Sequence, residues 1–500
     1  MTRRTDSSLR AGLRAGRLGT AALFAIGIAA VTPLSVVAGA IPLAYGQVQQ
    51  LGIPAGYAVT ALLLAIFTVG LAAMARHVPN AGAFYSYAAA GLGRPAGVAT
   101  AGIALVAYSC MQIGLYGAFG TAMTSALRVF GVQTYWGAWM SVGWLAIAVL
   151  GQLRIRMNAR ILAVLIAAEV LVVLLLDAVM IAHPAGGELS YDTLNPALLA
   201  NSTGAASLVG AVTGLVGFEI PLAHALLARD PRRTTRRAIG LILTVVALLY
   251  AGSAWAMSVA TGPDQIIAFA GSHLTDLFFV LPAPHVPAVV MDAATVLFAT
   301  SLFAAMLAFH STVARYTLTL AREGVLPRRL ALTRADEVPV AGSALQTAVA
   351  VVTLVVVVAL GLDPTTDLFF YGTISGGLGV LILMTVAAVA VIHFFHRHPH
   401  GENLWRRRIA PFCAALFLLV VLLATLAFYG ELLGTDDPVK IWAAPAGYAA
   451  VAATGVVWAY VLKVRRPDTY AAIGQGDRAV RAASIPGQRS STARHFPINH

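Results

Sequence analysis

The chain has 500 residues, of which 59% are hydrophobic and 11% are charged, and its mean hydropathy is +0.80. Soluble domains carry roughly 25% charged residues, so this composition excludes a soluble protein of this length. The formal net charge of +12 could indicate nucleic-acid binding, but the distribution of the basic residues along the chain excludes that interpretation, as shown below.

Apolar stretches of about 20 residues, each long enough to cross a bilayer as a helix, recur along the whole chain. They are too long and too continuously apolar to be barrel strands. We therefore predict an all-α integral membrane protein with twelve transmembrane helices. The predicted helices span residues 19–45, 57–75, 96–127, 135–152, 159–182, 204–228, 238–260, 287–313, 341–361, 370–395, 409–429 and 443–462.

Lysine and arginine are distributed unevenly between alternate connections. With the N-terminus placed in the cytoplasm, 31 of the 33 basic residues fall in cytoplasmic segments, and Arg128 and Lys440 alone fall outside. The positive-inside rule predicts such a split. We therefore expect a multi-pass protein of the cytoplasmic membrane with both termini in the cytoplasm. The partner of the basic charge is membrane lipid and not nucleic acid.

The two ends of the chain are predicted to lie outside the membrane. Residues 1–18 form a cytoplasmic tail, and the first apolar stretch is too long for a cleaved signal peptide. Residues 463–500 form a second cytoplasmic tail, which we expect to be disordered. Cys110 and Cys413 both fall inside predicted helices, so they form no disulfide framework and carry no metal-ligand spacing. The sequence indicates neither a metal nor a cofactor.

Two connections on the outer side are longer than the others, at about 183–203 and 261–286. The second contains "DQIIAFAGSHLTDLFFVL", which is apolar enough to fold back over the outer mouth of the protein. A lid and a plain packed loop are equally compatible with this sequence.

The chain divides into two units of five helices, 19–182 and 204–395, followed by two further helices at 409–462. Because five is odd, a second copy of the unit must lie inverted in the membrane, as in many secondary transporters. The first helix of each unit has a proline near its middle, Pro33 and Pro221. One membrane proline can be a simple kink, but two interruptions at matching positions point to a substrate site.

Four polar segments occur in the order and spacing of a known family. They are "ARHVPNAGAFYSYAAAGLGRPAG" at 75–97, "GFE" at 217–219 followed by "ARDPRRTTRRA" at 228–238, "ARYTLTLAREGVLPRRLA" at 314–331, and "RRPDTYAAIG" at 465–474. Together they resemble the amino acid–polyamine–organocation (APC) superfamily, and bacterial amino acid permeases in particular. The resemblance covers residues 15 to about 475.

This resemblance implies a leucine-transporter-type fold, a five-plus-five inverted repeat with two extra helices. It implies a secondary active transporter of amino acids or related amines that works by alternating access and is proton-coupled or exchanging. The chain departs from the family at Val31, Thr32 and Pro33, where many members have a Gly-Ser-Gly turn.

A broken helix can bind both charges of an amino acid zwitterion without charged side chains. Free amides at the start of a helix attract a carboxylate, and freed carbonyls accept from an ammonium group. We therefore predict a substrate site at the two breaks, with Phe218 as either a gate or a core residue. Its predicted residues are Val31, Thr32, Pro33, Leu34, Ser35 and Val36 in the first helix and Val216, Gly217 and Phe218 in the sixth.

Glu219 and Glu169 are the acidic residues placed deepest in predicted helices. An ionised carboxylate at membrane depth is costly, so each must face the bundle, pair or be protonated. Both are candidate proton-coupling residues. Glu219 could equally hold the break open, and Glu169 could equally be a helix contact. Asp177 and Asp292 lie near outer helix ends, where we expect them to be solvated or to line the mouth. We expect His310 to serve packing or a polar network.

Three polar residues of the third helix, Tyr108, Gln112 and Tyr116, recur every four residues and so share one face. In the eighth helix, Thr300 and Ser301 could line the cavity or supply oxygen ligands to sodium. We take Tyr108, Gln112 and Ser301 as candidate substrate contacts. Hydrogen bonding between helices is at least as good an explanation for each of them.

The leading functional hypothesis is a proton-linked permease whose substrate is an amino acid or a related amine. An exchanger is the alternative, and a sensor that binds without translocation is a weaker one, because no signalling domain is evident. No nucleophile, base and orienting group occur together, so we do not expect an enzyme. The predicted site contains no buried Lys or Arg, which disfavours an acidic substrate.

Overall fold

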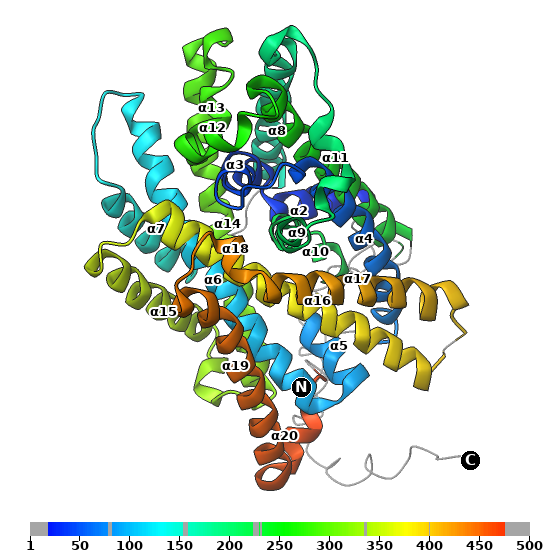
Figure 1. Cartoon of the computed structure of the whole chain (residues 1–500). Helices are drawn as coiled ribbons and strands as arrows, with labels where there is room; N and C mark the ends of the chain where they lie inside the picture. The colour runs from blue at the N-terminus through cyan, green and yellow to red at the C-terminus, as the bar shows by residue number, and fades with distance from the viewer. Residues whose placement is uncertain are drawn as a thin grey trace.

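The computed structural model describes residues 19–78, 83–153, 159–223, 230, 233–334, 338–399 and 401–475. All regular structure in that part of the chain is helical (Figure 1). The prediction of an all-α membrane protein is therefore confirmed. The predicted N-terminal tail and the last 25 residues lie outside the described residues.

Ten of the predicted transmembrane helices appear as long helices. Their bounds are α4 (Ile53–Met74), α6 (Arg94–Arg128), α7 (Trp136–Leu150), α8 (Ala159–Ala182), α11 (Arg233–Thr261), α14 (Ala288–Arg322), α15 (Val340–Ala359), α16 (Tyr371–Arg397), α17 (Ala410–Ala427) and α19 (Pro438–Arg465). Short helical extensions adjoin α16 and α19. A π-helical turn at Pro364–Phe370 leads into α16, and α20 (Pro467–Ala472) follows α19.

The two helices with matching prolines are each broken, as predicted. The first consists of α2 (Thr20–Val31), a π-helical stretch at Ser35–Ala40, and α3 (Ile41–Gly46). The sixth consists of α9 (Ser202–Gly214) and α10 (Ile220–Ala223), separated by a five-residue turn. Its predicted continuation to residue 228 lies outside the described residues.

Among the described residues, eleven helices are long and apolar enough to cross a membrane. They include the segment Ile266–His285, which the sequence places outside the membrane, and they omit α7 and α9, which are shorter. The multi-pass architecture therefore holds, whereas the count of twelve stays a prediction.

The outer segment for which a lid and a packed loop were equally compatible is helical and packs on the first broken helix. It contains α12 (Ile266–His273), which lies beside α3 in Figure 1, and α13 (Leu277–Val280), which packs on the π-helical stretch Ser35–Ala40. The approach is close, because a Cβ on Gly46 would lie 2.7 Å from the amide nitrogen of Gly271. This segment therefore covers α3 as ordered structure and is not an irregular loop.

α6 is the helix around which the others pack, with α5 (Ala83–Leu92), α7, α14, α16 and α19 against it. Small residues permit that approach, as is usual where membrane helices cross. A Cβ on Gly117 would lie 2.2 Å from the carbonyl oxygen of Pro364. The π-helical turn before α16 is therefore seated directly on the backbone of α6.

The segment after α19 is ordered and joins two parts of the fold, although the sequence predicts disorder from residue 463. The amide of Gly474 donates to the Tyr85 hydroxyl at 3.2 Å and to the Glu323 carboxylate at 3.1 Å. Tyr85, on α5, also donates to Glu323 at the end of α14. Arg94 donates to the carbonyl of Ala471 at 3.2 Å. The motif "RRPDTYAAIG" thus fastens the end of α14 to α5.

We expect Glu323→Gln to lower the free energy of unfolding by about 1.5–3 kcal/mol. The buried Glu323 carboxylate accepts hydrogen bonds from the Tyr85 hydroxyl and the Gly474 amide, and the substitution removes the charge that strengthens them. Thermal unfolding in detergent measures this effect, and Glu188→Gln, on an exposed loop, is the matched control. Tyr85→Phe and Glu323→Gln should together cost less than the sum of their separate effects. Strict additivity would show that the two residues do not act as one unit.

Candidate substrate site

The break in the first helix is centred on Thr32. This residue has φ +49° and ψ +71°, a left-handed conformation that is rare for a β-branched residue. Its amide still donates to the carbonyl of Ile28 at 3.2 Å, and its hydroxyl donates to the carbonyl of Val31 at 2.8 Å. Pro33 follows and has no amide to donate. Backbone strain of this kind is concentrated at functional sites.

The break in the sixth helix is centred on Gly217, which has φ +110°. Its amide donates to the Glu219 carboxylate at 2.9 Å. Glu219 therefore accepts a hydrogen bond from a backbone donor at the break, which fits the alternative that it holds the break open. Phe218 points into the protein core and is fully buried.

The two breaks touch each other. A Cβ on Gly217 would lie 2.9 Å from both the carbonyl carbon and the carbonyl oxygen of Ala30, and α10 packs on α2 (Figure 1). Only a residue without a side chain allows this approach. The substrate-site prediction required the breaks to be adjacent, and the fold brings them together.

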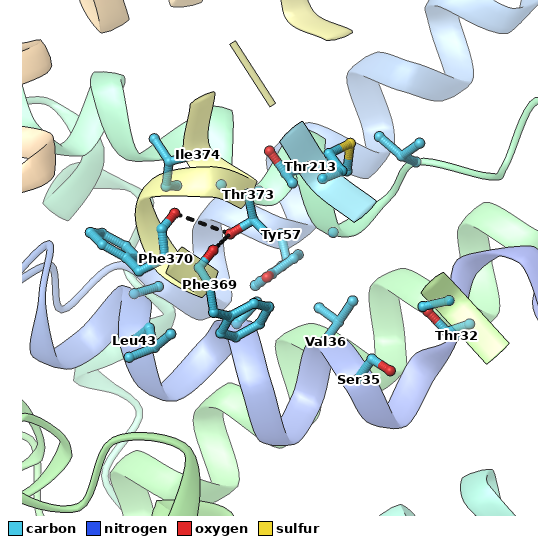
Figure 2. A pocket seen from close by; sticks show the side chains of 18 of the residues that line it. Thr32, Ser35, Val36, Leu43, Tyr57, Thr213, Phe369, Phe370, Thr373 and Ile374 are labelled. Carbon is cyan, nitrogen blue, oxygen red and sulfur yellow. Dashed lines mark hydrogen bonds between the residues drawn. The ribbon is translucent and has the colours of Figure 1, made fainter. Parts of the chain in front are cut away.

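A cavity, here called the central cavity, lies at this junction (Figure 2). The first helix contributes Thr32, Ser35 and Val36 to one side of it, and the start of α16 contributes Thr373 and Ile374 to another. Thr373 donates to the carbonyls of Phe369 and Phe370 at 2.6 and 3.1 Å. Its hydroxyl hydrogen is therefore committed to the helix.

The lining of the central cavity is apolar and carries no formal charge among the described residues. Its polar members are hydroxyl groups, those of Thr32, Ser35, Tyr57, Ser207, Thr213 and Thr373. Its large apolar members are Leu43, Ile53, Met111, Leu115, Phe309, Phe369, Phe370, Ile374 and Leu432. Such a wall binds an apolar group and leaves few polar atoms to orient it.

A second cavity lies beyond the breaks and contains Glu219, and it is called the Glu219 cavity. It shares Ala30, Val216 and Phe309 with the central cavity, so these residues form the layer between the two. Tyr108 stacks on Phe309 with ring centroids 6.1 Å apart. The remaining lining residues are Leu71, Phe84, Tyr87, Tyr108, Gly217, Ile220, Ala308, Thr312 and Tyr316.

Glu169 of α8 reaches the break in the first helix from behind. Ser301 donates to its carboxylate at 3.0 Å, and Ser35 donates to Ser301 at 3.0 Å. The amide of Leu34 also lies in hydrogen-bonding reach of this carboxylate. Glu169 is 7% exposed and lines neither cavity, whereas Ser35 lines the central cavity. A line of hydroxyl groups therefore joins the cavity to a buried acid.

This arrangement changes the expected set of donors for a substrate carboxylate. The amide of Leu34 faces Glu169, and the amide of Ser35 donates to the carbonyl of Thr32 at 3.1 Å. The Glu169 carboxylate thus lies at the end of the helix where a substrate carboxylate was expected. The Ser35 hydroxyl is the predicted donor of this segment that lines the central cavity.

Gln112 lies in a buried polar network that lines neither cavity. Its amide nitrogen donates to Tyr116 at 3.0 Å and contacts Nδ1 of His310 at 3.2 Å, and Gln346 donates to its oxygen at 2.7 Å. His310 Nδ1 is therefore an acceptor, and its Nε2–H donates to Ser343 at 2.8 Å. The network ties α6, α14 and α15 together, as the helix-contact alternative proposes.

Asp177 is not at a solvated mouth, so that expectation is wrong. It is 7% exposed, and Ser253 donates to its Oδ2 at 2.6 Å. Thr300 is exposed and donates to the carbonyl of Leu297 in its own helix. It therefore faces away from Ser301 and gives no support to the sodium alternative.

Several predicted residues line the central cavity, namely Val31, Thr32, Ser35, Val36 and Val216. Tyr108, Gly217 and Glu219 line the Glu219 cavity. Pro33, Leu34, Phe218, Gln112, Ser301 and Glu169 are buried outside both linings. Sequence analysis missed Tyr57, Phe309, Phe369 and Phe370, because nothing in an apolar helix marks which of its faces meets a cavity.

Comparison with known proteins identifies the family. A family model described as amino acid permease matches residues 18–451. The chain belongs to the amino acid permease family. No curated protein sequence is significantly similar to this permease.

Solved structures give the fold. The manganese transporter of Eremococcus coleocola, in complex with an aromatic bis-isothiourea substituted compound, has a TM-score of 0.56 at 13% identity over 88% of this chain and 93% of that chain. A variant of that transporter gives a TM-score of 0.54 at 13% identity over 88% and 92%. The predicted superfamily is confirmed, and the permease is a secondary transporter and not an enzyme.

Gly217→Ala should abolish transport, because a side chain at φ +110° is strained and its Cβ would lie 2.9 Å from the Ala30 carbonyl. Uptake of labelled substrate by reconstituted protein measures this. Gly240→Ala is the control, since a Cβ on Gly240 meets nothing within 4 Å. Full uptake by Gly217→Ala would show that the two breaks need not touch during transport.

Proposed function

We propose that this permease carries a neutral amino acid with an apolar side chain into the cell together with a proton. The observation that carries the proposal is the line of hydroxyl groups from Ser35 in the cavity, through Ser301, to the buried carboxylate of Glu169. Coupling needs a link between proton binding and substrate binding, and this line supplies one.

The link works through the direction of two hydrogen bonds. A serine hydroxyl has one hydrogen to donate. While Glu169 is ionised, Ser301 donates to it and Ser35 donates to Ser301, so Ser35 has no hydrogen for the cavity. A protonated Glu169 can donate to Ser301, and Ser301 can then donate to Ser35. The hydrogen of Ser35 is thereby released toward the substrate carboxylate.

Proton and substrate therefore favour each other's binding, which is the condition for symport, because such coupling is reciprocal. An ionised Glu169 at the helix end also repels the carboxylate of the substrate. Protonation of Glu169 removes that repulsion. Glu219 stabilises the break at Gly217 and lines the same cavity as Tyr108 and Tyr316. We assign it to the break and to the cavity beyond.

The substrate class follows from the lining of the central cavity. Its hydroxyl groups and backbone suit one carboxylate and one ammonium group, and its wall offers no charged partner for a third charge among the described residues. The free-energy cost of burying an unpaired charge is far larger than the gain from packing that group against an apolar wall. The apolar residues instead accommodate an aliphatic or aromatic side chain.

Reconstituted vesicles that enclose a pH dye test the coupling. Adding a pool of neutral apolar amino acids should acidify the interior, and Glu169→Gln and Ser301→Ala should reduce that acidification by about tenfold, a typical coupling factor. Thr300→Ala is the control, because Thr300 is the exposed neighbour of Ser301. Uptake only into preloaded vesicles, without a pH change, would make the protein an exchanger.

The side-chain specificity can be tested at Gly210 of α9. This glycine lines the central cavity, and a Cβ there would meet only Ile374 at 3.9 Å. Gly210→Leu should therefore exclude leucine and phenylalanine while retaining alanine, as competition against labelled alanine would measure. Gly447→Leu, on an exposed face of α19, is the control. Inhibition by lysine or glutamate as strong as by leucine would contradict the substrate class.

A further inference from the structure

A second buried acid, Asp177, lies on the same helix as Glu169 and has an unused oxygen. Ser253 of α11 donates to its Oδ2 at 2.6 Å, while its Oδ1 has no hydrogen-bond partner among the described residues. Buried polar atoms are nearly always paired with protein or water. An unpaired oxygen on a side chain that is 7% exposed marks a place where a proton or a water binds.

A second buried side chain with an unpaired polar atom belongs to α11, the helix of Ser253. Tyr250 is three residues before Ser253 on α11, is fully buried, and its hydroxyl has no partner among the described residues. Its ring packs edge-on against Tyr57, with centroids 5.2 Å apart. Tyr250 therefore contacts the wall of the central cavity, which Tyr57 lines.

The helix geometry arranges these groups in line. Glu169 and Asp177 are eight residues apart and so share one face of α8, with Val173 between them. Their separation along the axis is about 12 Å at roughly 1.5 Å per residue. α11 packs on α8, and the hydrogen bond between Ser253 and Asp177 fixes which residues of the two helices lie at the same level. Tyr250 precedes Ser253 by three residues and so lies about one turn of α11 nearer to the level of Glu169.

We propose that Asp177 is the residue that loads protons onto Glu169. A proton from the side of the membrane where α8 ends binds Oδ1 of Asp177. It passes to Glu169 through the hydroxyl of Tyr250 and water in the same gap. Asp177 is left ionised and is held by the hydroxyl of Ser253 until the next proton arrives. This inference rests on the proposed proton coupling and adds its entry route.

The other titratable groups around Asp177 fit this route. His183, six residues further along, is exposed at the end of α8 and stacks on His285 with centroids 3.6 Å apart. From α3, Tyr45 donates to the carbonyl of Ala254 at 3.0 Å. On α14, Asp292 is nine residues from Ser301, which turns it to the opposite face of that helix.

A metal cation is a poorer occupant of the gap than a proton. Hard cations take about six oxygen ligands, whereas the side chain that bonds to the Asp177 carboxylate among the described residues is that of Ser253. A carboxylate with one unpaired oxygen suffices to bind a proton.

The experiment compares two measurements on the same reconstituted full-length protein, internal acidification driven by alanine or leucine and counterflow of the labelled amino acid. Counterflow needs substrate binding and alternating access but no proton entry. We expect Asp177→Asn to lower acidification and pH-driven uptake by about tenfold and to leave counterflow within about twofold. Tyr250→Phe should act in the same direction, Asp177→Glu should restore acidification, and Asp292→Asn is the matched control.

The outcomes separate this inference from the proposed function. Absence of acidification in the wild type would defeat proton coupling itself. Normal acidification in Asp177→Asn, beside a coupled wild type, would overturn the role of Asp177 alone. Equal loss of acidification and counterflow in Asp177→Asn and Tyr250→Phe would overturn it as well, because it would show a structural defect. Acidification that requires sodium would replace the proton with a cation.

Discussion

Backbone polar groups freed inside a membrane must find partners, and the rest of this structure depends on how that constraint is met. Each broken helix satisfies most of its own free groups locally. The hydroxyl of Thr32 donates to the carbonyl beside it, and Glu219 accepts the amide of Gly217. The breaks then pack directly on each other at Ala30 and Gly217. Little backbone polarity is left over, so a ligand must be recognised through few polar atoms.

The buried acids Glu169, Asp177 and Glu219 lie outside the lining of the central cavity. The lining of the central cavity is neutral, while Glu169 reaches it only through Ser301 and Ser35. A charge placed directly in an apolar cavity would have to be matched by the substrate or remain unpaired. The two hydroxyl groups of Ser35 and Ser301 separate Glu169 from the cavity. We propose that this separation suits a neutral amino acid and that protonation of Glu169 changes which hydrogen bond Ser35 donates.

The first helix break also explains how Glu169, a carboxylate in α8, could influence the binding of a substrate. The start of a helix attracts one anion, and here the amide of Leu34 faces Glu169. In the proposed mechanism, a substrate carboxylate and the carboxylate of Glu169 compete for the same helix end. Protonation of Glu169 would decide that competition and make the free energy of substrate binding depend on the proton. The proposed route for that proton begins near the end of α8. It runs from Asp177, which Ser253 holds, through Tyr250 to Glu169.

The sequence by itself determined the membrane class, the two breaks and the family, because hydropathy, proline position and motif spacing are local properties. It also predicted Ser35, Thr32, Val36 and Glu219 beside a cavity. Only the tertiary structure decided that Asp177 is buried against Ser253, that Thr300 faces outward, and that Gln112 belongs to a network between helices. In a uniformly apolar helix every face has similar hydropathy, so the rotation of the helix, which decides what each polar residue meets, is set by packing against its neighbours.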